Sequence, residues 1–273
     1  MKLPAVATAS DSKLEDTGLE VVDIERNPAF LARKFHSRGA ALQMEAMQRI
    51  ARAFVENPET ILQELVNVAV EVCGADSAGI SIEKEDRTEE RFYHWVATAG
   101  EYSAFLDAVL PRYPSACGIC LERGRGQHFT VGQRYFDLMG ISAPLVTDGI
   151  LLPWVVDETR GTIFVMAHGR TEAFDQEDYR LMKVLADFAA LGVREQKQQE
   201  LLLQKARASA AGTMANELAH KINNPLQSLT NVLYLAAQAD HSDAASAWSV
   251  QALGELERLS WLVKQLLLLP YET

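Results

Sequence analysis

The stretch Gly149–His168, GILLPWVVDETRGTIFVMAH, contains two apolar runs separated by a short charged segment. Valine, isoleucine and aromatic residues favour strands, and the segment DETRG supplies polar turn residues and a glycine. We therefore predict an antiparallel hairpin with strands over 149–156 and 161–168. Upstream, DSAGISIE (76–83) and RFYHWVATA (91–99) flank a second charged turn and predict another pair of strands.

Helical patterns precede these strands. The segments 41–56 and 57–75 carry apolar residues at helical spacing. The second segment has Asn57 at the N-cap position, Pro58 at the first helical position and Gly74 at its end. Its predicted buried stripe consists of Ile61, Leu62, Leu65, Val68 and Val72. Helices and strands in this order predict an α+β domain.

Composition restricts the classes of function. The chain has 273 residues and a formal net charge of −11, so it repels a phosphate backbone and we expect no nucleic-acid partner. Its apolar runs are too short for a membrane span, and the N-terminus lacks the apolar core of a secretory signal. Three cysteines are too few for a disulfide framework. We expect a cytoplasmic protein with a flexible arm over residues 1–35.

Beyond the last strand, the sequence predicts helices only. The segment 174–193 begins with Asp175, a natural N-cap, and has Glu177 and Asp178 in its first turn. The helical pattern then continues to a polar turn, QADHSDA, and resumes over 244–269. Two long helices joined by a short turn are antiparallel neighbours, so we predict a helical hairpin.

Each helix of this hairpin has one apolar stripe. On an ideal helix the first stripe contains Leu218, Ile222, Leu226, Leu229 and Leu233. The opposite face carries His220, Asn223, Asn224, Gln227 and Asn231. The second helix presents Trp248, Ala252, Leu256, Leu259, Val263 and Leu266. Because one hairpin buries little apolar surface alone, we predict a homodimer that completes a four-helix bundle.

The segment HKINNPL (220–226) combines a histidine, two asparagines and a proline inside a helix. Pro225 cannot donate to the carbonyl of Lys221, so we expect a bend in the turn after His220. The segment resembles the phospho-acceptor box of the HisKA-type dimerisation hairpin in sensor histidine kinases. The resemblance covers residues 205–269 and implies that His220 accepts a phosphoryl group. By position alone, a surface histidine on a polar face is the simpler interpretation.

The resemblance assigns roles to the neighbours of His220 and has one departure. Asn224 matches the position that orients a water molecule for dephosphorylation. Lys221 stands where the family has an acidic residue, and an ammonium group cannot accept a hydrogen bond from the imidazole. Glu217 lies one helical turn before His220, so we hypothesise that it substitutes for the missing acid. The competing hypothesis is that the chemistry of this site has been lost.

The preceding domain resembles a GAF sensory domain over residues 45–195. The resemblance rests on LVNVAVEVCGADSAGISI, SACGICLERG and GTIFVMAHGRTEAFDQEDYRLMKVLADFAA. It implies an antiparallel sheet with flanking helices and a pocket for a small molecule, whose identity the sequence does not indicate. No residue of the sequence requires a tetrapyrrole bound through a cysteine. The NKFDE-type signature of cyclic-nucleotide GAF domains is absent as an ordered motif.

Cys117 and Cys120 form a CxxC motif without a second cysteine pair. A zinc site would need His94 and His128 as further ligands, so we predict no metal and interpret both cysteines as small core residues on a helical turn. We interpret His94 as a strand residue rather than a haem ligand.

These expectations give four segments: a flexible arm (1–35), a GAF-like domain (36–195), a connector helix (196–210) and a phospho-acceptor hairpin (211–273). The function implied by the resemblance is the sensory and phospho-acceptor part of a cytoplasmic sensor histidine kinase, whose partner is a response-regulator receiver domain. The alternatives are a non-enzymatic dimeric scaffold and a phosphotransfer protein phosphorylated in trans. The sequence contains no glycine-rich nucleotide motif, so we expect a separate domain to supply ATP, and enzyme activity of these residues alone stays undecided.

Overall fold

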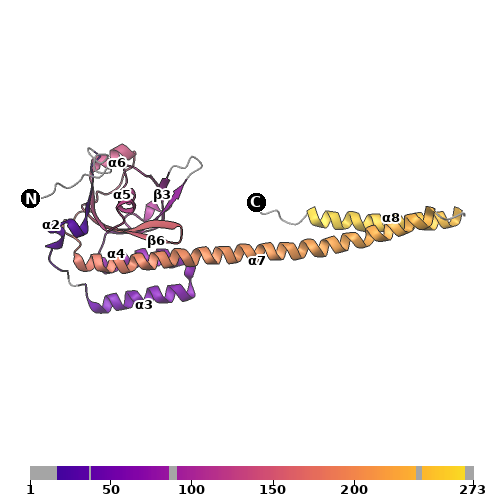
Figure 1. Ribbon diagram of the computed structural model, residues 1–273, viewed down its shortest axis with the longest axis horizontal. Coiled ribbons are helices and arrows are strands. Elements are labelled where there is room, and N and C mark those ends of the chain that lie inside the picture. Colours follow the sequence, from indigo (N-terminus) through magenta and orange to yellow (C-terminus); the bar gives the residue numbers. More distant parts are fainter. Residues whose placement is uncertain (1–16, 37, 86–90, 238–241, 268–273) are drawn as a thin grey trace, which may run out of the picture. The chain divides into compact units, whose positions relative to one another are not determined.

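A computed structural model describes residues 17–36, 38–85, 91–237 and 242–267 (Figure 1). Within these residues, seven strands form one antiparallel sheet in the order β1-β5-β6-β7-β2-β3-β4. The strands are β1 (Leu19–Asp23), β2 (Ser77–Glu85), β3 (Arg91–Gly100), β4 (Val109–Pro111), β5 (Gln127–Val131), β6 (Asp148–Val156) and β7 (Thr159–Ala167). The predicted hairpins are confirmed as β2–β3 and β6–β7. The second turn is tighter than expected, because Val156 already pairs with Thr159.

Helices flank both faces of the sheet. The helices within the described residues are α2 (Pro28–Leu31), α3 (Ala40–Glu56), α4 (Ile61–Cys73), α5 (Ala116–Arg123), α6 (Gln133–Met139), α7 (Gln176–Ala237) and α8 (Ser242–Leu267). Single 3-10 turns lie at η1 (Ile24–Arg26), η2 (Pro58–Thr60) and η3 (Ser103–Phe105). In Figure 1, α4 and the first part of α7 lie on one side of the sheet, and α5 and α6 lie on the other. The sheet is therefore buried on both faces.

Two cores result from this arrangement. In β7, Ile163 and Val165 face the core under α4 and α7, whereas Phe164 and Met166 face the core under α5 and α6. Successive strand residues point to opposite faces, so a strand buried on both sides reads as a continuous apolar run. This explains why β6 and β7 lack the alternation of a half-exposed strand.

The predicted stripe of α4 is confirmed, since all five of its residues are buried in the first core. Gly74 ends the helix in the left-handed conformation, with φ of 56°. A glycine accepts this conformation without the steric cost that a Cβ atom brings. Asn57 is the N-cap of a preceding 3-10 turn, but its side chain makes no capping hydrogen bond there.

The prediction of a flexible arm is wrong for residues 19–31. Strand β1 pairs with β5, and Ile24 and Phe30 are fully buried in the first core. Asn27 caps α2 by accepting hydrogen bonds from the amides of Ala29 and Phe30. The apolar residues of this segment show no sustained period, so only their long-range contacts reveal the structure. Residues 1–16 of the predicted arm lie outside the described residues.

The chain divides into two compact units, 1–198 and 199–273, and α7 contributes to both. In the second unit, α7 and α8 pack along one buried line. Its buried members are Pro225, Leu229, Val232 and Leu262. Of the predicted stripe, Leu218 and Ile222 are half-buried, whereas Leu226 is 47% exposed and Leu233 is 62% exposed. The predicted turn between the helices lies largely outside the described residues.

None of the helices in the described part of the chain combines the length and the apolar run that a membrane crossing requires.

Candidate functional site

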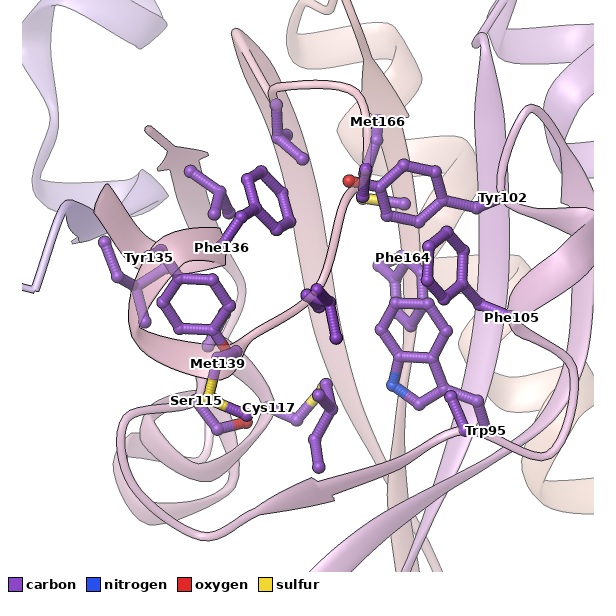
Figure 2. Close-up of a pocket in the computed structure, with 18 of the residues that line it drawn as sticks. Trp95, Tyr102, Phe105, Ser115, Cys117, Tyr135, Phe136, Met139, Phe164 and Met166 are labelled. Atoms are coloured by element: carbon purple, nitrogen blue, oxygen red, sulfur yellow. The ribbon is translucent and has the colours of Figure 1, made fainter. Parts of the chain in front are cut away.

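A cavity of about 210 Å³ lies in the second core, between the sheet and helices α5 and α6 (Figure 2). Its lining comes from segments far apart in the sequence. Trp95 belongs to β3, Cys117 to α5, Tyr135 and Phe136 to α6, and Phe164 to β7. A cavity assembled from several elements and lined by apolar side chains is the usual form of a small-molecule site.

A β-bulge aims Trp95 into this cavity. In the β2–β3 pair, Ile80 pairs with Ala97 but Ser81 pairs with Trp95, so Val96 is an extra residue in β3. An extra residue reverses the face of everything on one side of it. Ala97 therefore packs in the first core, whereas Trp95 packs in the second. Without the bulge, the two residues would lie on the same face.

Aromatic rings form one wall of the cavity. The ring of Trp95 lies 4.8 Å from Phe164 and 6.1 Å from Tyr102, measured between centroids. Phe105 of η3 lies 4.9 Å from Tyr102. Such tilted and stacked pairs are favourable arrangements of aromatic quadrupoles. The wall offers flat surfaces to a ligand.

The polar atoms of the lining are few and neutral. The hydroxyl of Tyr102 donates to the carbonyl of Pro144 at 2.6 Å, and the hydroxyl of Tyr135 donates to Pro114 at 3.0 Å. Burial raises the pKa of both phenols well above the usual range, so both remain protonated. The indole Nε1 of Trp95 is buried and has no hydrogen-bond partner within the described residues.

Cys117 and Cys120 are buried on α5, which confirms the interpretation of core residues on a helical turn. The hydroxyl of Thr162 donates to Sγ of Cys117 at 3.2 Å, and Cys117 lines the cavity. Burial raises the pKa of both thiols, which disfavours the reactive thiolate.

The two histidines considered with these cysteines have other partners. His94 is a strand residue, as predicted, and its Nε2 lies 3.0 Å from Asp107. Nε2 of His128 lies 2.6 Å from Asp148, which is fully buried. Asp148 also accepts from Arg33 at 2.8 Å and from the amide of Phe174 at 3.1 Å. This network joins the N-terminal segment, the sheet and the approach to α7.

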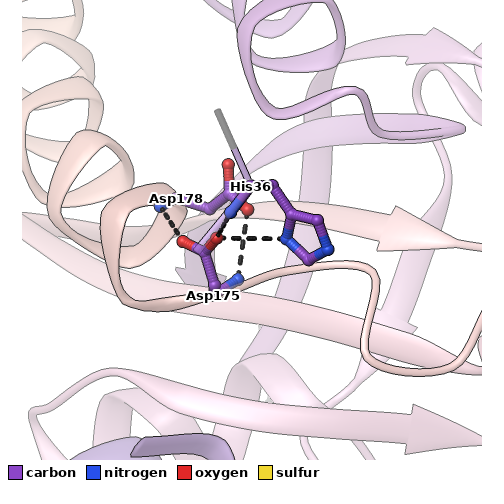
Figure 3. Close-up of side chains that lie close together, drawn as sticks. All are labelled: His36, Asp175 and Asp178. Atoms are coloured by element: carbon purple, nitrogen blue, oxygen red, sulfur yellow. Dashed lines mark hydrogen bonds and ion pairs between the residues drawn. The ribbon is translucent and has the colours of Figure 1, made fainter. Parts of the chain in front are cut away.

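Within the described residues, His36, Asp175 and Asp178 form the group that has metal-ligand geometry (Figure 3). Asp175 accepts from the amides of Glu177 and Asp178, and Asp178 accepts from the amide of Asp175 at 3.1 Å. This reciprocal pattern is a capping box, and it confirms Asp175 as the N-cap of α7. His36 and Arg38 bind the outward sides of the two carboxylates. The group therefore already has a structural role.

The residues predicted for phosphoryl chemistry lie together on α7 in the second unit. Glu217, His220, Lys221 and Asn224 are all exposed. Helical geometry places His220 roughly 200° around the helix axis from Leu218, and hence opposite the line that packs on α8. Helix α7 continues through Pro225.

The residues that line the cavity were not predicted from the sequence. The available signal was the concentration of aromatic residues between Phe92 and Phe105, which includes Trp95 and Tyr102. The period of two in a regular strand would put Trp95 on the same face as Ala97, so this signal does not identify which aromatic residues face the cavity.

Comparisons with known proteins match the first unit. The model of the GAF domain family matches residues 55–194. The GAF domain of an Acinetobacter phosphoenolpyruvate-protein phosphotransferase is 13% identical, with a TM-score of 0.44 over 57% of this chain and 95% of that chain. The phycoerythrobilin-bound GAF domain of a cyanobacterial phytochrome is 15% identical, with a TM-score of 0.42 over 59% and 99%.

Free methionine-R-sulfoxide reductase from Neisseria meningitidis, solved with its substrate, is 15% identical and has a TM-score of 0.45 over 62% of this chain and 98% of that chain. No protein of curated function matches the sequence. The family match spans just over half of the chain and contains strands β2 to β7 of the antiparallel sheet with helices α4, α5 and α6. The chain therefore belongs to the GAF domain family.

Proposed function

We propose that this chain is the sensory and phospho-acceptor part of a two-component sensor histidine kinase, with His220 as the phosphorylated residue. The chain carries a GAF domain, which fits a signalling sensor. The finer assignment depends on the second unit.

The observation that carries the proposal is the exposed face of α7 around His220. The imidazole lies opposite the line that packs on α8, so a kinase domain and a receiver domain have access to it. Leu226 and Leu233 lie roughly 60–80° from that packed line and leave the face of His220 uncovered. A residue that must be reached by two large partners in turn needs such a position.

The chemistry requires little more than an accessible neutral imidazole. One ring nitrogen attacks the γ-phosphorus of ATP, the bond to the bridging oxygen breaks and ADP leaves. A hydrogen-bond acceptor at the other nitrogen makes the attacking nitrogen more basic. We assign this role to Glu217, one turn away, because Lys221 lacks acceptor capacity. Asn224 is one turn beyond His220, where its amide would orient a water molecule for dephosphorylation.

A homodimer is part of this proposal. Leu226, Leu233, Leu256 and Val263 are between 45% and 62% exposed. Seven residues separate the two members on each helix, which is the heptad spacing of a coiled-coil seam. Because α7 and α8 run antiparallel, the pair on α7 and the pair on α8 lie on the same side of the packed line. A second copy would bury this strip as a four-helix bundle.

Phosphorylation of the whole chain tests the proposal. The protein is incubated with radiolabelled ATP and with each ATP-binding domain of the histidine kinases from the same organism. We expect an acid-labile label that His220→Ala abolishes and that the control His36→Ala retains. A label that persists in His220→Ala would refute the assignment.

One observation favours a second candidate function. Lys221 replaces the acidic residue of the family pattern, and this replacement is what a chain with lost phosphoryl chemistry would show. In that case the chain is a non-enzymatic dimeric GAF scaffold that binds a partner through the hairpin. Absence of label with every kinase domain, together with a stable dimer, would support the scaffold. Labelling of His220 in trans by one of them would exclude the scaffold, and it is the outcome expected both of the phospho-acceptor part of a kinase and of a phosphotransfer protein.

A further inference from the structure

Trp95 provides an unused hydrogen-bond donor at the edge of the cavity. The residue is 8% exposed, and its Nε1 has no partner among the described residues. Figure 2 shows this nitrogen on the ring edge that is turned toward the side of the pocket where Cys117 lies. A buried donor without a partner costs free energy, so such a group in a cavity indicates the position of a ligand acceptor.

A second tryptophan, Trp154, provides a comparison, because its indole nitrogen is also unpaired among the described residues but it does not line the cavity. Its Nε1 is also buried without a partner within the described residues. The ring of Trp154, however, packs against Gly161 in the first core, away from the cavity. Trp95 lines the cavity and Trp154 does not, so of these two donors we assign a ligand acceptor only to Nε1 of Trp95.

The other polar atoms of the lining restrict the charge of the ligand. The hydroxyl protons of Tyr102 and Tyr135 are directed to backbone carbonyls. The lining residues within the described chain carry no ionised side chain, and their surface is mainly apolar and aromatic. Because a charge buried without a partner is strongly unfavourable, this lining selects neutral molecules.

The volume restricts the size. An engineered cavity of about 150 Å³ with a comparable apolar lining binds benzene. The present cavity, about 210 Å³, has space for a substituted single ring or a small bicyclic ring. A tetrapyrrole or a cyclic nucleotide is larger and carries anionic groups that this lining would leave unpaired.

We propose that the cavity binds a small neutral aromatic molecule that carries one hydrogen-bond acceptor, with the acceptor placed on Nε1 of Trp95. The inference deepens the proposed sensory role by naming the class of ligand. Binding is measured without phosphorylation, so this inference and the assignment of His220 succeed or fail separately.

Three probes of the same shape isolate the acceptor. Acetophenone has a carbonyl, α-methylstyrene has a methylene group in its place, and benzoate has a carboxylate. Titrations of the whole chain are followed by saturation-transfer NMR of the probes. One hydrogen bond gives a preference for acetophenone over α-methylstyrene of about 3- to 10-fold. We expect benzoate to bind more weakly than acetophenone.

Two matched variants locate the contact. Trp95→Phe keeps an aromatic ring but removes the donor, so the preference for acetophenone should disappear. Trp154→Phe removes the other unpaired indole and should leave the preference unchanged. The indole N–H resonance of Trp95 in the unmodified chain gives an independent measurement. Acetophenone should move this resonance downfield relative to its position with α-methylstyrene, because both rings exert a similar ring-current effect and only the carbonyl accepts a hydrogen bond.

Equal affinity for acetophenone and α-methylstyrene would overturn the inference, as would tighter binding of benzoate or no binding of any probe. A preference that survives in Trp95→Phe would also overturn it. If Trp95→Phe does not fold, the indole resonance decides, since an unchanged signal in saturating acetophenone contradicts the proposed contact.

Discussion

Replacing Asp148 with asparagine removes a buried charge that joins three parts of the GAF domain. The carboxylate is fully buried and accepts from Arg33, His128 and the amide of Phe174. The side chain of Arg33 is only 10% exposed. Asparagine has almost the same shape, so the variant removes the charge and one acceptor oxygen while it keeps the packing.

The expected loss of stability follows from the charge of Arg33, which the substitution leaves without its carboxylate partner. Breaking a buried ion pair by neutralising one member leaves the other charge uncompensated, at a cost of about 3–5 kcal/mol. Arg33 retains its contact with the carbonyl of Phe174 at 2.8 Å, which favours the lower end of this range. For a domain of this size, the loss corresponds to a fall of about 1–3 M in the urea midpoint.

Tryptophan fluorescence provides the assay, in a background that reports the GAF domain alone. Trp248 and Trp261 belong to the second unit, so both are first replaced with phenylalanine. The control is the double variant that adds Arg33→Met to Asp148→Asn. It removes both charges and should recover part of the stability. A midpoint within about 0.3 M of the parent would refute the reasoning, because the buried charge would then contribute little.

The pH dependence supplies a second readout of the same residue. Burial raises the pKa of Asp148, but hydrogen bonds from His128 and Arg33 outweigh this effect, so its pKa is lowered in the folded protein. The carboxylate therefore contributes stability above its unfolded pKa of about 3.9, and this contribution is lost as the pH falls toward the folded value. Asp148→Asn should flatten the stability profile in that acid window. A profile with the parent's acid slope would contradict the assignment.

Three further predictions concern other parts of the fold. Gly100 has a φ of +76°, and Gly100→Ala places a Cβ atom 2.0 Å from a carbonyl oxygen. In urea titration this variant should be clearly less stable than Gly140→Ala, whose Cβ atom meets nothing within 4 Å. Asp175→Ala removes the cap of α7 and should lower the free energy of unfolding by about 1–2 kcal/mol in the same assay. Burial and the raised pKa of Cys117 and Cys120 should make their reaction with an aromatic disulfide reagent slow until urea is added, and fast reaction in the native protein would contradict the buried positions.

Local signals were sufficient for the elements that need little tertiary context. The stripe of α4, the left-handed Gly74 and the cap at Asp175 each depend on residues within one or two helical turns. The hairpin β6–β7 depends on two apolar runs and the turn between them. The prediction that Cys117 lies on a buried helical turn has the same basis. Sequence patterns report such features because their spacing and caps are properties of adjacent residues.

Tertiary contacts decided the remainder. The bulge at Val96 reverses the face of β3, and only its pairing with β2 reveals the extra residue. Phe30 is buried because β1 and α2 pack on a distant part of the domain, so a segment without periodicity became part of the core. In the hairpin, Leu226 and Leu233 lie beside the packed line, since a narrow stripe meets α8. The cavity depends on the bulge, which turns Trp95 toward it, and its walls come from strands and helices whose relative positions no local pattern encodes.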